Sequence, residues 1–158
     1  MPKDFIADKS VWERMKKNLL KGQSLAVKVG GFEESVYGEE NEYLPVAQVM
    51  QWNEEGSETN PMRPFIRYYI SQLEKEGKFI PAISEHLHLV ATGKLTWTKL
   101  YEIIGKEASE DLKKVVEEWA IPPNSPTTEE IKERNDPLVD TGFMRDSITY
   151  KIGRKTDR

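Results

Sequence analysis

Apolar residues recur every three or four positions along four stretches of the chain, and this spacing predicts amphipathic helices. The four stretches cover residues 9–21, 65–76, 80–91 and 97–119. The last stretch is the longest, and its apolar positions keep the spacing from end to end. Gly105 falls inside it, where glycine costs about 1 kcal/mol relative to alanine without breaking a helix. The pattern therefore predicts four helices, the most regular of them at 97–119.

Shorter segments alternate apolar with polar residues, which is the pattern of a strand with one buried face. Residues 25–29 alternate in this way, and so do residues 148–152 near the C-terminus. Residues 46–52 fit either a strand, with Val46 and Trp52 on one face, or a helix. We favour the strand, so that three strands are expected in all.

Loops and two short helical turns account for the rest of the pattern. The acidic stretch 32–44 is predicted as a loop, and prolines interrupt the segment that follows the long helix. A short helix is expected to start at Thr127 or Thr128 and to end at Arg134. Residues 143–148 suit a second helical turn.

The order of these elements predicts an α+β fold. The expected architecture is a small, mostly antiparallel sheet packed against several helices, including the long helix at 97–119. A single domain is expected over residues 1–153, with residues 154–158 as a disordered C-terminal tail.

Composition narrows the class of protein. The chain has 158 residues, 37% of them hydrophobic and 32% charged, which suits a soluble globular protein. Its net charge of -4 argues against a general nucleic-acid binder, which would present a basic face. Cysteine is absent, which excludes disulfides and thiolate chemistry and is compatible with a reducing compartment. No apolar run approaches the roughly 18 residues of a spanning helix, and the N-terminus lacks a signal-peptide pattern, so no membrane contact is expected.

The triplet Asp140-Thr141-Gly142 has two interpretations. An aspartic protease needs two such carboxylates in near contact, sharing one proton, and the chain has one triplet. The alternative is a structural turn in which the Asp140 carboxylate caps the short helix that follows, with Thr141 at its first position. We favour the cap, and we predict no catalytic residue here.

His86 and His88 are the only histidines, and Glu85 lies beside them. On a strand, positions two apart share a face and can hold a metal ion. On the helix predicted here, they point about 200° apart and cannot grip one ion. The sequence therefore predicts no metal site and no cofactor.

The stretch "NPMRPFIRYY" is the other unusual one. Pro61 and Pro64 stiffen the approach to a helix, with Pro64 at its first position, and Arg63 and Arg67 project from one end. The arginines are either surface residues of a helix start or a bidentate group offered to a carboxylate of a neighbouring subunit. Trp52, just before the loop, is a candidate interface anchor.

Two segments together carry a family resemblance. "VAQVMQWNEEGSETNPMRPFIR" and "IPPNSPTTEEIKERNDPLVDTGFMRDSITYKI" resemble the neck and tail-completion proteins of tailed bacteriophages, a head–tail connector and virion morphogenesis family. The likeness covers about a third of the chain, and Glu55 is an extra glutamate in the first motif. The matching positions are Asn53, Glu54 and Gly56 in a turn, Arg63, Pro64 and Phe65 at a helix entry, and Pro137, Leu138, Asp140, Thr141 and Gly142 near the C-terminus.

The resemblance implies a structural, non-enzymatic virion protein. Such a protein forms a homo-oligomeric ring in the neck between head and tail, is assembled in the host cytoplasm, and takes part in head–tail joining. The implied partners are further copies of the chain, a head connector or adaptor protein, and a tail terminator or tail tube protein. Phage DNA would pass through the channel without sequence-specific binding, and the matching residues would be architectural. Two alternatives stay open, a small acidic-residue hydrolase and a non-enzymatic host-side interaction module.

Overall fold

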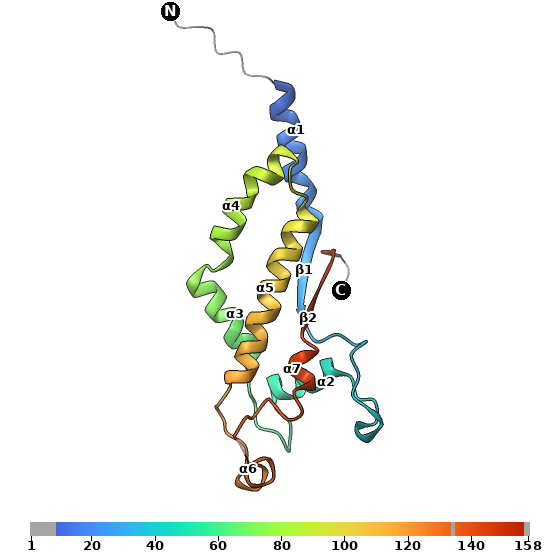
Figure 1. The fold of residues 1–158 in the computed structure, drawn as a ribbon, viewed down its shortest axis with the longest axis vertical. Coiled ribbons are helices and arrows are strands. Elements are labelled where there is room, and N and C mark those ends of the chain that lie inside the picture. The colour runs from blue at the N-terminus through green and yellow to red at the C-terminus, as the bar shows by residue number, and fades with distance from the viewer. Residues whose placement is uncertain (1–8, 134, 157–158) are drawn as a thin grey trace, which may run out of the picture.

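The computed structural model describes residues 9–133 and 135–156, which form an α+β fold of helices around a small antiparallel sheet (Figure 1). The α-helices are α1 (Lys9–Leu20), α2 (Val46–Glu55), α3 (Phe65–Glu76), α4 (Phe79–Thr92), α5 (Trp97–Glu118), α6 (Pro126–Lys132) and α7 (Phe143–Asp146). The strands are β1 (Leu25–Gly30) and β2 (Thr149–Arg154), and two 3-10 helices lie at Lys21–Ser24 and Glu39–Asn41. The predicted class is confirmed, and so are the four long helices.

The sheet joins segments from opposite parts of the sequence. β1 pairs with β2 in antiparallel register, from Leu25 opposite Arg154 to Gly30 opposite Thr149. β2 runs further than predicted, and the Lys155 N–H then donates to the Ser24 carbonyl at 2.9 Å. The expectation of a disordered tail is therefore wrong for residues 154 and 155, because strand pairing holds them. Residues 157 and 158 lie outside the described part.

Helix α5 lies along the sheet and carries Gly105 on the face that meets it (Figure 1). A Cβ atom at Gly105 would lie 2.6 Å from Cδ2 of Tyr150 and 2.9 Å from Cγ2 of Val27. Both distances are far below van der Waals contact, so the helix can approach the two strands this closely only where no side chain intervenes. Gly105 is thus a packing residue, and this role explains a glycine in the middle of the longest helix.

We expect Gly105→Ala to lower the stability of the fold. At an exposed position inside a helix, replacing glycine with alanine would raise the free energy of unfolding by about 1 kcal/mol. Here overpacking against the sheet costs about 1–3 kcal/mol, which outweighs that gain and leaves a net loss of up to about 2 kcal/mol. Urea unfolding followed by circular dichroism measures the change. In a Tyr150→Ala background most of the loss should disappear. A Gly105→Ala variant as stable as the parent when Tyr150 is present would contradict the close approach.

The hydrophobic core has two parts. The larger one joins α2, α3, the second half of α5 and the segment around α7, and its buried members are Val46, Met50, Phe65, Tyr69, Leu112, Val116, Leu138, Val139, Met144 and Ile148. The smaller one joins α4 to the first half of α5 through Val90, Leu100 and Ile104. Most of the predicted site residues lie around the larger part.

Residues 46–52 are helical, so the predicted third strand is wrong. Val46 and Met50, four positions apart, are 0% and 3% exposed because one helix face turns both into the larger core. As a strand the segment would have to pair with a neighbour, yet residue 45, just before it, forms only an isolated bridge with Val36. Burial of the helical face therefore decides between two patterns that the sequence supports equally.

One smaller difference concerns the start of α6, and another concerns the 32–44 loop. α6 begins at Pro126 with Ser125 as its cap, and the Ser125 hydroxyl accepts from the Thr128 N–H at 3.2 Å. The predicted start at Thr127 or Thr128 is therefore late by one or two positions. The 32–44 loop contains the 3-10 turn Glu39–Asn41 and otherwise lacks regular structure apart from its bridge to residue 45.

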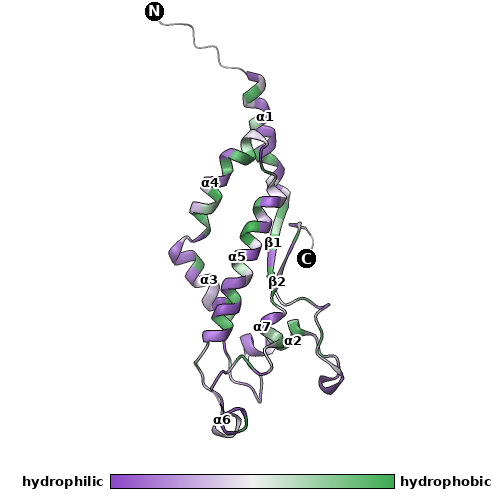
Figure 2. Ribbon diagram, viewed as in Figure 1, coloured by the Kyte–Doolittle hydropathy of each residue, from purple (hydrophilic) through white to green (hydrophobic). Residues whose placement is uncertain are grey.

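Helix α1 projects from the body of the protein (Figure 1). Its second half lies against the end of α4, where the Asn18 side chain donates to the Ala91 carbonyl at 3.1 Å and Trp97 Nε1 donates to the Asn18 carbonyl at 2.9 Å. Its first half extends past α4, and none of the twelve residues of α1, all described, is buried. Apolar and polar positions alternate along it in Figure 2, and Trp12 is 64% exposed. None of the described helices is long and apolar enough to cross a membrane.

Candidate functional site

The corner between α2 and α3 is built on the carboxylate of Glu54. Its oxygens accept from the backbone N–H groups of Ile66 and Arg67 at 2.8 and 3.1 Å, and from Arg67 Nε at 2.8 Å. The Arg67 guanidinium also donates to the Glu54 carbonyl at 2.9 Å. The Glu54 side chain is only 11% exposed. One carboxylate from the end of α2 thus caps the start of α3, where free N–H groups and the helix dipole favour negative charge.

Arg63 lies inside the protein, only 6% exposed. Its Nε donates to the Pro122 carbonyl at 3.2 Å and its Nη2 to the Pro123 carbonyl at 3.3 Å. Its backbone N–H donates to the Asn53 carbonyl at 2.6 Å. Burial lowers the pKa of the Arg63 guanidinium. Both interpretations of Arg63, as a surface residue of a helix start and as a group offered to a neighbouring subunit, are therefore wrong, because the guanidinium is buried and bonds two carbonyls of its own chain.

The rest of the first motif closes the same corner. Gly56 ends α2 with φ at +78°, and a Cβ there would lie 3.0 Å from the backbone nitrogen of Met62, so glycine suits both the conformation and the space. Pro64 stands at the position before the helix rather than at its first residue, and Phe65 is fully buried in the core. Trp52 is 40% exposed. Among the candidate site residues of this motif, Trp52 and Arg67 are exposed.

The C-terminal motif forms a second bend, which Lys132 fastens. Pro137, Leu138 and Val139 are buried, and Lys132 Nζ donates to the Val139 carbonyl at 3.1 Å. The same Nζ lies 3.6 Å from an Asp140 carboxylate oxygen. The bend therefore anchors its apolar residues in the core and leaves the Asp140 side chain, 77% exposed, at the surface.

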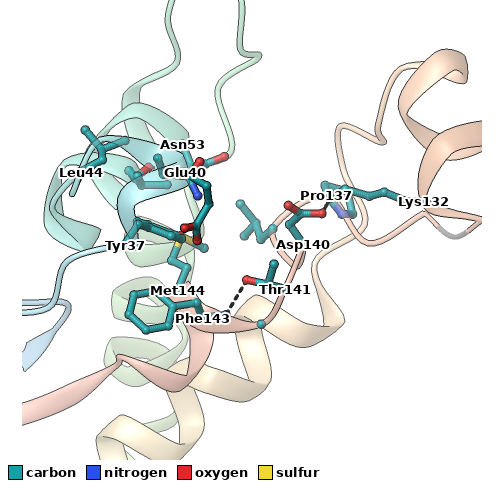
Figure 3. Close-up of a pocket in the computed structure, with 15 residues that line it drawn as sticks. Tyr37, Glu40, Leu44, Asn53, Lys132, Pro137, Asp140, Thr141, Phe143 and Met144 are labelled. Carbon is teal, nitrogen blue, oxygen red and sulfur yellow. Dashed lines mark hydrogen bonds and ion pairs between the residues drawn. The ribbon is translucent and has the colours of Figure 1, made fainter.

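Asp140 does not cap α7 as predicted. The position before the helix is Gly142, and the side-chain oxygen that receives the Phe143 N–H is that of Thr141, at 3.3 Å (Figure 3). The helix starts two residues later than the cap interpretation required, at Phe143, so the Asp140 carboxylate falls outside its reach. The triplet forms a turn before a helix, as the structural interpretation expected. The side chain that accepts from the helix N–H group is Thr141, however, and not Asp140.

The bend, Asn53 of α2 and the 37–44 loop line a cavity of about 530 Å³ (Figure 3). Tyr37 and Phe143 close one side, with their ring centroids 4.9 Å apart. Burial, together with the negative charge of Asp140, raises the pKa of Tyr37. The cavity thus offers an aromatic wall, the carboxylate of Asp140 and the amide of Asn53, a combination suited to hydrogen bonding with a polar segment of another molecule.

The histidines lie on a helix, as predicted. Both belong to α4, and His86 Nδ1 is 2.8 Å from the Ala82 carbonyl of the preceding turn. Across residues 9–133 and 135–156, no group of three or more His, Cys, Asp or Glu side chains is placed to hold a metal ion.

A groove between α3, α5 and residues 119–122 is the feature that the sequence did not predict. It measures about 790 Å³, and its lining includes Tyr68, Tyr69, Trp119 and Ile121. The rings of Tyr68 and Trp119 meet edge to face with centroids 5.6 Å apart. Helical periodicity marks Tyr69 and Trp119 as core positions, but nothing in the sequence shows that the proline segment folds back beside α3.

The protein has an α+β fold in which the two motif segments contact each other. Arg63 of the first segment bonds the proline carbonyls of the second, and Asn53 and the 137–142 bend share one cavity. Compared with known proteins, the chain matches no family model, no curated protein and no solved structure.

Proposed function

We propose that this protein is a structural component of a tailed-phage virion that forms a homo-oligomeric ring in the neck between head and tail. The observation that carries the proposal is the presence of two exposed apolar surfaces, carried by elements that lie far apart on one elongated chain. Figure 1 shows this elongated arrangement of the elements. One is the outer end of α1 with Trp12, and the other is the groove beside Trp119. A ring subunit needs two such different patches, one for each neighbour.

The bonding of the two motif segments supports the same function. Glu54 and Arg63 are occupied by backbone groups of their own chain, so these motif residues brace the subunit. Trp52 and Asp140 stay exposed and are available for contacts with the head connector or the tail proteins. A braced corner loses little conformational freedom when it docks, which favours assembly.

The charge of the chain suits a passage for DNA. With a net charge of -4, the subunit offers few surplus cations that would hold phosphates. In the proposed ring, DNA slides through the channel without sequence-specific binding. The head connector or adaptor would contact one face of the ring, and the tail terminator or tail tube protein the other.

The native mass of the full chain tests this function. We expect light scattering to give a mass of several subunits at concentrations in the micromolar range and above, and negative-stain electron microscopy to show closed rings. A monomer or a dimer at every concentration would contradict the ring. Mass spectrometry of purified tailed particles then tests the location, which requires the protein to be present in stoichiometric amounts in the neck.

A further inference from the structure

The groove between α3 and α5 holds two buried polar groups that lack a partner. The Tyr69 hydroxyl and Trp119 Nε1 have no hydrogen-bond partner among residues 9–133 and 135–156, although both atoms are buried. Tyr69 is only 8% exposed, and both side chains line the groove. Both atoms have almost no accessible surface, so they mark a poorly satisfied patch below the groove wall and are not themselves contact points for a partner.

The groove is also apolar where it is open. Ile121, at its rim, is 77% exposed and Tyr68 is 48% exposed. Pro122 extends this surface, and Arg63 holds the proline segment in place by bonding the Pro122 and Pro123 carbonyls. The groove is therefore a fixed surface, shaped before any partner arrives.

Helix α1 offers a second exposed apolar surface. Met15 and Leu19 of α1 are partly buried, and helical spacing places Val11 and Trp12 on the same face, nearer the start of the helix. The outer end of α1 extends past the end of α4 (Figure 1). Trp12 is 64% exposed and Val11 is 37% exposed. A tryptophan on a projecting helix is the residue type that most often anchors an interface.

Charge favours the pairing of these two surfaces. α1 carries four basic side chains, Lys9, Arg14, Lys16 and Lys17, against the single acidic one of Glu13. The groove is lined by the acidic residues Glu76, Asp111 and Glu118 and by two lysines. One of these, Lys78, is held by Asp111 at 2.5 Å. Opposite charge steers association and fixes its orientation.

We propose that the α3–α5 groove receives the outer end of α1, with Trp12 as the anchor, from a second copy of this chain. This contact rests on the proposed ring, and it names the surfaces that form it. α1 and the groove lie at distant places on the chain, so one subunit cannot fill its own groove (Figure 1). The contact is head-to-tail, and such a contact closes into a ring when the rotation between subunits divides a full turn.

Cysteine pairs test the contact directly, because the chain has no cysteine of its own. The variant Glu13→Cys with Ile121→Cys keeps Trp12 and places one thiol on each surface. A short bismaleimide should then give a ladder of covalent oligomers on a denaturing gel. The matched control is Glu13→Cys with Ile131→Cys, since Ile131 on α6 is 78% exposed, as Ile121 is at 77%. The control should stay monomeric on the gel.

Two further variants separate the contact from the fold. Trp12→Ala should raise the concentration needed for assembly at least tenfold and leave the melting temperature of the dissociated chain unchanged. Tyr43→Ala, at a position 61% exposed, is the matched aromatic control and should assemble normally. Tyr69→Phe removes an unpaired hydroxyl that lies below the groove surface, so the dissociated chain should be as stable as the parent or more so, and assembly should be unchanged.

The outcomes distinguish this inference from the proposed function. A ladder that depends on Cys at position 121, together with loss of assembly in Trp12→Ala, supports the contact. Rings that form normally in Trp12→Ala and give no ladder with the 13–121 pair would overturn the contact and leave the ring intact. A parent chain that stays monomeric at every concentration would overturn the ring, and the contact with it.

Discussion

Glu54→Ala is expected to lower the free energy of unfolding by about 2–3 kcal/mol, the sum of a lost helix cap and a lost charge-assisted bond. The change would leave the Ile66 and Arg67 N–H groups without their acceptor and would remove the partner of the Arg67 guanidinium. For a chain of this size the melting temperature should fall by about 5–10 °C. Thermal unfolding followed by circular dichroism measures it.

The neighbouring glutamate provides the control. Glu55 is exposed, and its carboxylate accepts from the Gln51 side chain at 3.3 Å, so Glu55→Ala should shift the melting temperature by less than about 2 °C. Glu54→Gln keeps the shape and one acceptor oxygen, and it should lose part of the stability that the alanine variant loses. Equal melting temperatures for Glu54→Ala and Glu55→Ala would show that Glu54 does not brace the corner.

Arg63→Ala should cost about 2–4 kcal/mol, because it removes a buried cation that satisfies two carbonyls and leaves a cavity beside the core. The proline segment then loses its two bonds to the first motif. Urea unfolding of the dissociated chain measures the loss. Assembly should weaken as well, as a consequence of the disordered groove, and it should recover partly at low temperature.

A second arginine serves as the comparison. Arg67 is 60% exposed in its side chain, so Arg67→Ala should cost about 1 kcal/mol or less. One result for Arg63 itself would instead support a contact of its guanidinium with a neighbouring subunit. If Arg63→Ala keeps full stability and still blocks assembly, the guanidinium acts on a neighbouring subunit.

The sequence was informative wherever local periodicity and burial agree. The helix at Trp97–Glu118 and the strands at Leu25–Gly30 and Thr149–Arg154 follow from the spacing of apolar residues alone. Residues 46–52 fit two periodicities, and contacts with residues distant in sequence decided between them. Local pattern therefore predicts an element only when a single period suits it.

The candidate site was less predictable because its bonds span long separations. Glu54 reaches residues on the next helix, and Arg63 reaches carbonyls on the far side of α5 in the sequence. No local rule pairs a side chain with a backbone group that distant. For Asp140 a local rule was applied and gave the wrong residue. The rule predicted that Asp140 caps α7, whereas Gly142 holds the cap position and the Thr141 side chain accepts from the Phe143 N–H. The groove was missed because it depends on where the proline segment folds.

The pairing of β1 with β2 has a consequence for biosynthesis. β1 leaves the ribosome early, and its partner emerges only after α2 to α7 have been made. Until then the nascent chain exposes the edge of β1 and the face of α5 around Gly105, both of which are open to wrong pairing with other nascent chains. In the proposed ring, a chain should therefore become competent to join only once β2 has been made, which would keep chains that lack β2 out of the ring.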